Sequence, residues 1–222
     1  MSAVQLPLEQ RFVLHNVDWD TYVTFSDKLG ERNIRFNYNG VNLELVTLSP
    51  EHEYAKRWLA RLLETITEEM DIDIAGFGSM TCRREDLEHG FEPDECYWIG
   101  RETEIRGRDH IDLTRDPPPD LLLEVEISRS FLDRLAIAAR LGVPEVWRYD
   151  GQTLRIMLLG PDGQYTESPR SNALPFLPVA ELVRFLHSDT TQSGTKRLRA
   201  FRAWVREQMA RGWGAPSGGE NS

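Results

Sequence analysis

The spacing of apolar residues predicts β-strands on both sides of one long helix in the first half of the chain. Residues 34–47 hold two runs of β-favouring side chains around Asn39-Gly40, a dipeptide suited to the positive φ angles of a two-residue turn. Ser49 and Pro50 supply a capping hydroxyl and a first-turn proline, and apolar residues follow at helical spacing as far as Met70. We therefore predict a hairpin over 34–47 and a helix that begins at Pro50.

Short apolar runs in the middle of the chain predict further strands. The clearest is LLLEVEI at residues 121–127, the most apolar run in the sequence. Residues 100–119 are polar and end in three prolines, a composition that predicts a long loop. The remaining predicted elements are a helix at 131–141 and strands at 80–84, 94–99, 145–149 and 154–159. The order hairpin, helix, strands, helix and strands predicts an α/β fold, a sandwich built around a mixed sheet.

The C-terminal part of the chain predicts two helices and a tail. Residues 180–186 have helical spacing, and residues 195–211 form an amphipathic stretch with six basic side chains and one acid. The apolar stripe of this stretch consists of Leu198, Phe201, Trp204, Val205 and Met209. A surface helix packed by that stripe is the favoured interpretation, and a contact with nucleic acid or a partner is the alternative. Residues 212–222 have a composition that is typical of disorder.

Composition restricts the location and the partners of the protein. The 222 residues carry a net charge of -10 and contain no apolar run near the roughly 18–20 residues that span a bilayer, so no membrane contact is expected. The N-terminus lacks a basic start followed by a long apolar stretch, and we therefore expect a cytoplasmic protein without a secretory signal. We interpret Cys82 and Cys96 as small buried hydrophobes rather than a disulfide framework. The acidic balance opposes general binding to polyanions but allows a local basic groove.

Acidic residues that share one strand face are the chemically informative feature. Side chains two apart on a strand point the same way, so Glu124 and Glu126 share a face with Asp120. If this strand pairs antiparallel with the one before it, Asp94 falls opposite the region of Glu124. Such a patch of carboxylates needs a positive partner, and a divalent metal ion is the natural candidate. The alternative, which the spacing alone favours, is that Asp94 caps a turn and the glutamates pair with arginines on an exposed face.

Several ordered motifs resemble one protein family. They are Ser49-Pro50-Glu51-His52, Gly90-Phe91-Glu92-Pro93-Asp94, Pro118-Pro119-Asp120-Leu121, Glu124-Val125-Glu126-Ile127-Ser128 and Gly142-Val143-Pro144-Glu145-Val146-Trp147. Together they resemble the Uma-two family of restriction-endonuclease-like proteins, within the PD-(D/E)XK nuclease superfamily, over about residues 15–190. The resemblance implies a restriction-endonuclease-like core of helix, strands, helix and strand, here with an N-terminal hairpin and C-terminal helices. We accordingly divide the chain into a nuclease-like domain (1–190), a basic amphipathic helix (191–211) and a disordered tail (212–222).

The resemblance also implies site residues, and the chain departs from the family pattern at one of them. Asp94 matches the acid of the Pro-Asp motif and Glu124 the acid of the Glu-x-Lys motif, and both are expected to hold the metal ion. Glu126 stands where the lysine of that motif is expected. Arg134 on the following helix is the expected substitute for stabilising phosphate charge, although an arginine transfers protons poorly because it stays protonated. Lys56 is a second candidate at the edge of the packed face of the first helix, where a lysine snorkelling over that edge is the alternative.

These features lead to two hypotheses of different classes. The first is a Mg²⁺- or Mn²⁺-dependent DNA endonuclease in which Asp94 and Glu124 hold the metal ion and Glu126 assists them. In it, Arg134 or Lys56 orients the attacking water or the scissile phosphate. The second hypothesis is a nuclease-like fold that has lost turnover and binds nucleic acid or protein, because the motif lysine is missing and the net charge is acidic. Nucleases of this superfamily often act as dimers, so the resemblance further implies a homodimer.

Overall fold

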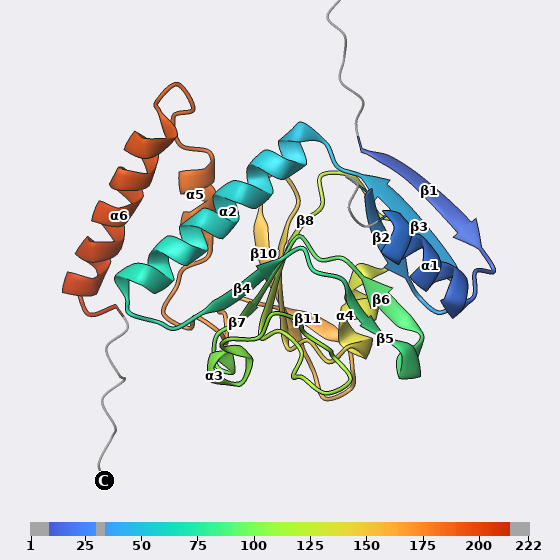
Figure 1. The fold of residues 1–222 in the computed structure, drawn as a ribbon. Coiled ribbons are helices and arrows are strands. Elements are labelled where there is room, and N and C mark those ends of the chain that lie inside the picture. Colours follow the sequence, from blue (N-terminus) through green and yellow to red (C-terminus); the bar gives the residue numbers. More distant parts are fainter. Residues whose placement is uncertain (1–8, 30–33, 214–222) are drawn as a thin grey trace, which may run out of the picture.

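Two β-sheets with helices packed against them make up the protein (Figure 1). The computed structural model describes residues 9–29 and 34–213. One sheet has five strands in the order β1-β3-β2-β6-β5, and the other has six in the order β11-β10-β9-β8-β7-β4. The strands are β1 (Gln10–His15), β2 (Ile34–Tyr38), β3 (Asn42–Thr47), β4 (Ala75–Gly78), β5 (Cys82–Arg84), β6 (His89–Phe91), β7 (Glu95–Trp98), β8 (Leu121–Val125), β9 (Glu145–Tyr149), β10 (Leu154–Leu159) and β11 (Tyr165–Ser168). The helices are α1 (Trp19–Leu29), α2 (Pro50–Glu69), α3 (Glu102–Ile105), α4 (Arg134–Arg140), α5 (Ala180–Leu186) and α6 (Gly194–Ala210), with a 3-10 turn, η1, at Glu85–Leu87.

The five-stranded sheet is antiparallel throughout and is built on the hairpin of β2 and β3. Gly40 in the turn has a φ of +88°, a conformation that a residue with a side chain adopts only with strain. The hairpin lies where the sequence predicts it, but its two turn residues are Gly40 and Val41, and Asn39 precedes them and accepts hydrogen bonds from the backbone of Val41 and Asn42. Helix α1 packs on one face of the sheet through Tyr22, whose ring stacks on that of Tyr38 with 4.8 Å between the centroids.

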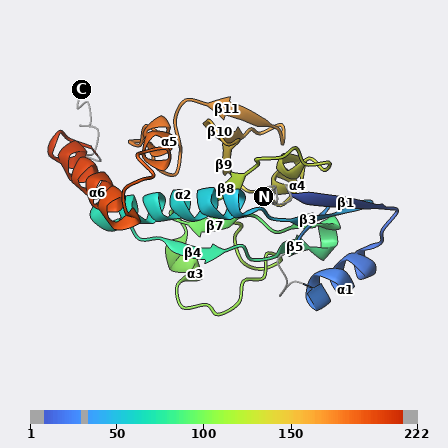
Figure 2. The same cartoon turned by 90° about the horizontal axis from the view of Figure 1, so that it is seen from above.

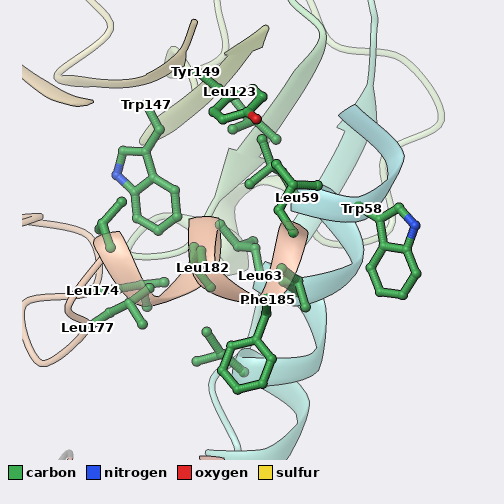
Figure 3. Packing of buried hydrophobic residues seen from close by; sticks show 14 of the residues in the cluster. Trp58, Leu59, Leu63, Leu123, Trp147, Tyr149, Leu174, Leu177, Leu182 and Phe185 are labelled. Carbon is green, nitrogen blue, oxygen red and sulfur yellow. The ribbon is translucent and has the colours of Figure 1, made fainter. Parts of the chain in front are cut away.

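The six-stranded sheet carries the main core of the protein. Its strands β8 and β9 are parallel, and the other neighbouring pairs are antiparallel. Side chains alternate along β8, so Leu121, Leu123 and Val125 join a cluster with α2 and α5, while Leu122 joins a second cluster with α4. Figure 3 shows how side chains of the sheet, α2 and α5 meet in the first of these clusters. Strand β8 is thus buried on both faces, which positions its acidic residues inside the protein rather than on its surface.

Helix α2 begins where the sequence predicts and crosses the six-stranded sheet. Ser49 is its N-cap and accepts a hydrogen bond from the backbone of His52 at 3.1 Å, with Pro50 in the first turn. Leu59 and Leu63 of its apolar face are at most 1% exposed. Burial of each such leucine contributes roughly 1.5–3 kcal/mol relative to an exposed side chain, so packing fixes the helix on the sheet. Neither α2 nor any other described helix has the length and apolar composition of a membrane span.

The basic helix α6 packs against α2 and α5. Phe201 and Val205 are fully buried in the main core. Arg202 and Arg206 both form ion pairs with Glu69 at the end of α2. Figure 2 shows α5 and α6 at the end of α2 that is remote from α1 and β1. This packing agrees with the interpretation of residues 195–211 as a helix held by its apolar stripe, whereas residues 214–222 of the predicted tail lie outside the described residues.

The structure differs from the sequence prediction in its short elements and in the number of sheets. The apolar pattern predicts one mixed sheet, whereas β6 pairs with β2 and β5 pairs with β6, so that these strands belong to a second sheet. The pattern misses β1, α1, β4 and β11, places a turn at residues 89–91 where β6 lies, and places a loop where α3 interrupts residues 100–119. The predicted helix at 131–141 begins only at Arg134, because Asp133 caps it by accepting a hydrogen bond from the backbone of Ala136 at 3.1 Å. The missed elements are short, and their pairing depends on distant residues that periodicity does not report.

Candidate active site

Two acidic residues meet where β7 and β8 run side by side. The strands are antiparallel, and Glu95 is paired with Leu123. Asp94 immediately precedes β7, so it lies beside Glu124 on the neighbouring strand. The backbone N–H of Val125 donates a hydrogen bond to Asp94 Oδ2 at 2.7 Å, which holds the acid against β8. This antiparallel pairing is the condition on which the expected proximity of Asp94 and Glu124 depends.

A buried histidine faces the other oxygen of Asp94. Asp94 is 1% exposed, and its Oδ1 lies 2.8 Å from His52 Nε2 on helix α2. The second ring nitrogen of His52 is 2.6 Å from Glu9 Oε1. Burial alone would lower the pKa of His52, but the two carboxylates outweigh it and raise that pKa to about 9. Burial acts to raise the pKa of Asp94, yet the hydrogen bond and charge of His52 hold it below its usual value, so Asp94 is an ionised acid beside an imidazolium.

Glu124 is the second acid of the pair and lies at the bottom of a cleft. It is 5% exposed, and neither of its carboxylate oxygens receives a hydrogen bond from the described residues. Arg134 forms a short ion pair with it from the first turn of α4. Burial raises the pKa of Glu124 to about 8, with Arg134 opposing the rise and Asp94 adding to it. The ion pair with Arg134 compensates the charge at Oε2, whereas Oε1 has no partner among the described residues, and an additional cation beside it would favour the ionised form.

Arg134 is enclosed between this acid and an aromatic ring. Its Nη2 donates a hydrogen bond to the backbone carbonyl of Glu92 at 3.2 Å, and its guanidinium carbon lies 5.9 Å from the centroid of the Phe91 ring. Its Nε has no hydrogen-bond partner in the described part of the chain. A guanidinium has five N–H donors, so Arg134 retains donors that can bind the oxygens of a phosphate.

Glu126 faces the same cleft, but its charge is already compensated. Its Oε2 accepts a hydrogen bond from Arg148 Nε at 2.6 Å, and its Oε1 accepts one from the backbone of Ser130 at 3.2 Å. Arg148 comes from β9, where it is aligned with Glu124 across the parallel pair of strands. Glu126 therefore holds Arg148 at the cleft and fixes the start of the loop that follows β8.

The cleft above these acids has a volume of about 360 Å³. Strands β8 and β9 form its floor, and the loop 128–133 with the start of α4 forms one wall. Its charged lining residues are Glu124, Glu126, Arg129, Asp133, Arg134 and Arg148. The volume lies at the small end of the roughly 300–1,000 Å³ of pockets that hold one small ligand. The cleft can therefore accommodate a group of about the size of a nucleotide.

The loop 128–133 is held in place by a buried carboxylate of the five-stranded sheet. Glu44 on β3 is fully buried and accepts hydrogen bonds from the Phe131 backbone at 2.8 Å and from Ser130 Oγ at 2.7 Å. Arg11 on β1 lies 3.3 Å from the same carboxylate. Although Glu44 lies outside the cleft, it positions one wall of it.

Lys56 and Asp120, two polar residues considered from the sequence, lie away from the cleft. Lys56 projects from α2 with its Nζ 3.2 Å from Glu53 Oε2, and it does not line the cleft. Asp120 precedes the other end of β8, where it accepts a hydrogen bond from Arg101 Nε at 2.7 Å. The remaining predicted site residues lie at the cleft or beside it: Asp94, Glu124, Glu126 and Arg134.

The two acids suit Mg²⁺ better than a metal that needs a full set of protein ligands. Among residues 9–29 and 34–213, no group of three or more His, Cys, Asp or Glu side chains is arranged to hold a metal ion. Mg²⁺ is commonly bound by one or two carboxylates together with water and phosphate oxygens. Asp94 and Glu124 supply two such carboxylates on adjacent strands, and the oxygens of Glu124 lack hydrogen bonds. These residues therefore fit a hard divalent cation, and they are the ones that would hold it.

Sequence reasoning misses three residues that support the acids: Glu9, His52 and Arg148. A signal for His52 exists, because it lies seven residues before Leu59 and thus on the buried face of α2. A histidine on such a face close to a helix start needs a polar partner. Glu9 and Arg148 carry no local signal, because their partners come from distant parts of the chain.

Comparison with known proteins places this arrangement in a family. A family model described as "Putative restriction endonuclease" matches residues 19–191, a span that includes α2, both strands of the acid pair and α4. The match covers well over half of the chain, so the protein is a nuclease-like protein of the restriction-endonuclease class. The chain belongs to the Uma2 family, as the ordered sequence motifs imply.

A solved structure also matches the chain in a comparison of structures. It is the crystal structure of a "putative nuclease belonging to DUF820" from Anabaena variabilis, with a TM-score of 0.48 and 15% sequence identity. The similarity covers 85% of this chain and 99% of that chain. No curated protein matches the chain.

Proposed function

We propose that this protein is a Mg²⁺- or Mn²⁺-dependent nuclease that hydrolyses phosphodiester bonds in DNA. The observation that carries the proposal is the pair of buried acids on adjacent strands, in which Glu124 has two oxygens without hydrogen bonds at a cleft that it shares with Arg134. Metal-assisted hydrolysis of a phosphodiester needs carboxylates for the cation and a positive group for the phosphate. Both kinds of group meet here in one cleft of nucleotide size.

The acids have distinct roles in this proposal. Asp94 and Glu124 would hold the metal ion, which when bound supplies an activated water and stabilises charge on the phosphate. His52 donates a hydrogen bond to Asp94 and compensates its charge, so Asp94 stays ionised and correctly oriented. Glu9 orients His52 from the opposite side of the ring. Glu9 and His52 therefore position Asp94, the metal ligand, without themselves touching the substrate.

The arginines of the cleft bind negative charge. Arg134 has spare N–H groups beside Glu124 and stabilises the charge that develops on the phosphate. Arg148 is held at the cleft by Glu126 and adds a second positive group. Neither guanidinium accepts a proton from water, because arginine stays protonated. Proton transfer by a positioned side chain contributes about 10²–10⁴-fold to rate, so we expect slow turnover.

Cleavage of plasmid DNA with and without Mg²⁺ or Mn²⁺ tests the proposal. We expect metal-stimulated cleavage by the wild-type protein, with loss of cleavage in Asp94→Asn and Glu124→Gln. Lys56→Gln, outside the cleft, is the matched control and should retain activity. In parallel, the metal should raise the melting temperature of the wild-type protein but not that of Glu124→Gln. The proposal would be contradicted if the wild-type protein cleaved no DNA with either metal ion and if its melting temperature did not change when the metal ion was added.

A second function is favoured by the absence of the motif lysine. Glu126 stands at the position of that lysine and accepts a hydrogen bond from Arg148, while Arg134 forms an ion pair with Glu124. These contacts favour a protein that keeps the fold and binds nucleic acid or a protein without turnover. Metal binding that depends on Asp94 and Glu124, together with no cleavage of any DNA, would support this alternative. Cleavage that disappears in Asp94→Asn would exclude it.

The setting of the nuclease is part of the same proposal. We propose a homodimer, because nucleases of the superfamily that the motifs resemble often act as dimers, and we propose that it works in the cytoplasm. Sedimentation of the purified protein with and without DNA tests the first point. A monomer under both conditions would contradict it.

A further inference from the structure

We infer that the cleft takes an unpaired stretch of nucleic acid rather than an intact duplex, and that Phe131 stacks on one of its bases. The inference rests on the proposed nuclease function and specifies the substrate class for it. It starts from the exposed aromatic side chain of Phe131, which belongs neither to the hydrophobic core nor to the acid pair.

Phe131 is held rigidly with its ring in solvent. It is 70% exposed, more than any other large apolar side chain in the described structure. Its backbone N–H donates a hydrogen bond to Glu44 at 2.8 Å, and the preceding Ser130 donates another to the same buried carboxylate. The following residue, Leu132, is buried. A ring on a fixed backbone loses little conformational freedom on binding, so it is pre-organised for a ligand.

The position of Phe131 links the cleft to a second hollow. Phe131 lines the cleft of about 360 Å³ and also an adjoining groove of about 500 Å³ that Phe12 of β1 lines as well. Phe12 is itself 60% exposed. A strand that passes from the groove into the cleft therefore meets two aromatic rings in succession. Successive aromatic rings beside a basic residue are the usual platform for unpaired bases.

Among the arginines that line the cleft, Arg129 is the one without an acidic partner in the described part of the chain. Glu126 is paired with Arg148, and Glu124 is paired with Arg134. The Asp133 carboxylate also lines the cleft, but it caps α4, whose N-terminal dipole offsets its charge. Arg129 is exposed on the same loop, two residues before Phe131, and forms no ion pair with the described residues. Arg129 is therefore the side chain that can contact a phosphate next to the stacked base.

The depth of the acids favours an unpaired strand. Glu124 is 5% exposed at the bottom of a cleft of about 360 Å³. The major groove of B-DNA is already about 12 Å wide and the double helix is wider still, so the body of a paired duplex stays outside a cleft of this size. An unpaired nucleotide can turn inward at little unstacking cost, as substrates do in enzymes that act on extruded nucleotides. The stacked base on Phe131 would then hold the strand while its neighbour reaches the acids.

Binding of labelled oligonucleotides to the full-length protein tests the inference, measured by fluorescence anisotropy in EDTA and in Ca²⁺. The probes are a single strand and the blunt duplex of the same sequence. We expect tighter binding of the single strand, a loss of about 5- to 150-fold in Phe131→Ala, and recovery in Phe131→Trp, since one stacked base is at stake. Val41→Ala removes an exposed apolar side chain that lines neither hollow and should bind like the wild type. Arg129→Gln should reduce the slope of log affinity against log salt by about 0.7, the value for one phosphate of a single strand.

The failures of the inference and of the proposed function differ. Equal or tighter binding of the duplex, or equal affinity in Phe131→Ala and the wild type, overturns the inference while metal-dependent cleavage of duplex DNA still supports the function. No binding of either probe by the wild type overturns both. A third outcome is that Phe131→Ala abolishes self-association in sedimentation but leaves nucleic-acid binding unchanged. This result would identify the surface around Phe131 as a protein interface, and it also overturns the inference.

Discussion

Replacement of His52 by glutamine tests whether a buried imidazolium holds the acid pair together. His52 is 1% exposed and lies 2.8 Å from Asp94 and 2.6 Å from Glu9. Glutamine keeps a polar side chain of similar length but removes the positive charge that both carboxylates share. Removal of one partner from a buried ion pair costs about 3–5 kcal/mol, because the other charge is left uncompensated. We expect the free energy of unfolding to fall by about this amount near pH 6.

This loss should depend on pH in a defined direction. The pKa of His52 is 6.5 in its usual state and about 9 in the folded protein. The folded state thus binds the proton more strongly, so the stabilisation from His52 is complete below pH 6.5 and disappears as the pH rises through 9. A pKa difference of about 2.5 corresponds to about 3 kcal/mol at 1.36 kcal/mol per pKa unit. The difference between wild type and His52→Gln should therefore shrink by about 3 kcal/mol between about pH 6 and pH 10.

Urea unfolding followed by tryptophan fluorescence measures this difference at both pH values. The buried acids with raised pKa values, Glu92, Glu95 and Glu124, lower the stability of both proteins as the pH rises, so only the difference between the proteins reports His52. His110→Gln, at an exposed histidine, is the control and should lose little at either pH. An equal loss in His52→Gln at both pH values would refute the imidazolium, and no loss near pH 6 would refute the buried pair itself.

Three further predictions concern the cleft and the core. The pKa of Glu124 is about 8 in the folded protein, above its value in the unfolded chain, so the wild-type protein loses stability as the pH rises from about 5 to 9. Glu124→Gln removes this titration and should make the free energy of unfolding less dependent on pH over that range. Urea titrations in which Glu124→Gln keeps the pH dependence of the wild type would contradict this. Gly90→Ala should cost about 1–3 kcal/mol in thermal unfolding, since the new Cβ collides with the hydroxyl of Tyr22, whereas at Gly100 a new Cβ stays 3.9 Å from its nearest neighbour and should cost little. Arg197→Ala should cost about 1–3 kcal/mol, because this buried arginine donates hydrogen bonds to two backbone carbonyls at the end of α5, and an unchanged urea midpoint would refute that role.

The elements that the sequence predicts best are those whose ends are fixed by neighbouring residues. Helix α2 begins at Pro50 and the hairpin of β2 and β3 turns at Gly40, close to where the pattern puts both. Strands β9 and β10 also lie where the pattern puts them, on either side of Asp150-Gly151. Caps and tight turns join residues only a few positions apart, so their energetics can be read locally. Strands β1 and β6 pair with β3 and β2, which lie far along the chain, and no local pattern specifies them.

The candidate site divides in the same way. Strand periodicity puts Glu124 and Glu126 on one face, and both line the cleft. The fate of these two acids differs, because Arg148 arrives beside Glu126 only through the parallel pairing of β8 with β9. Lys56 has the spacing of a residue at the edge of a packed face, yet its nearest acid is Glu53 on its own helix. Which basic side chain serves which acid is therefore decided by packing rather than by spacing.

The sequence by itself predicted the order of the main elements and named Asp94 and Glu124 as candidate acids, through the family motifs and strand periodicity. It also indicated the family, because the order of several motifs along the chain is visible in the sequence even though the contacts between individual residues are not. Only the tertiary structure decided that Asp94 is ionised beside His52, that Glu124 is buried with unsatisfied oxygens, and that Phe131 remains in solvent. The physical reason is that charge state and exposure depend on burial and on short distances between groups from different segments. Those distances exist only once the chain has folded.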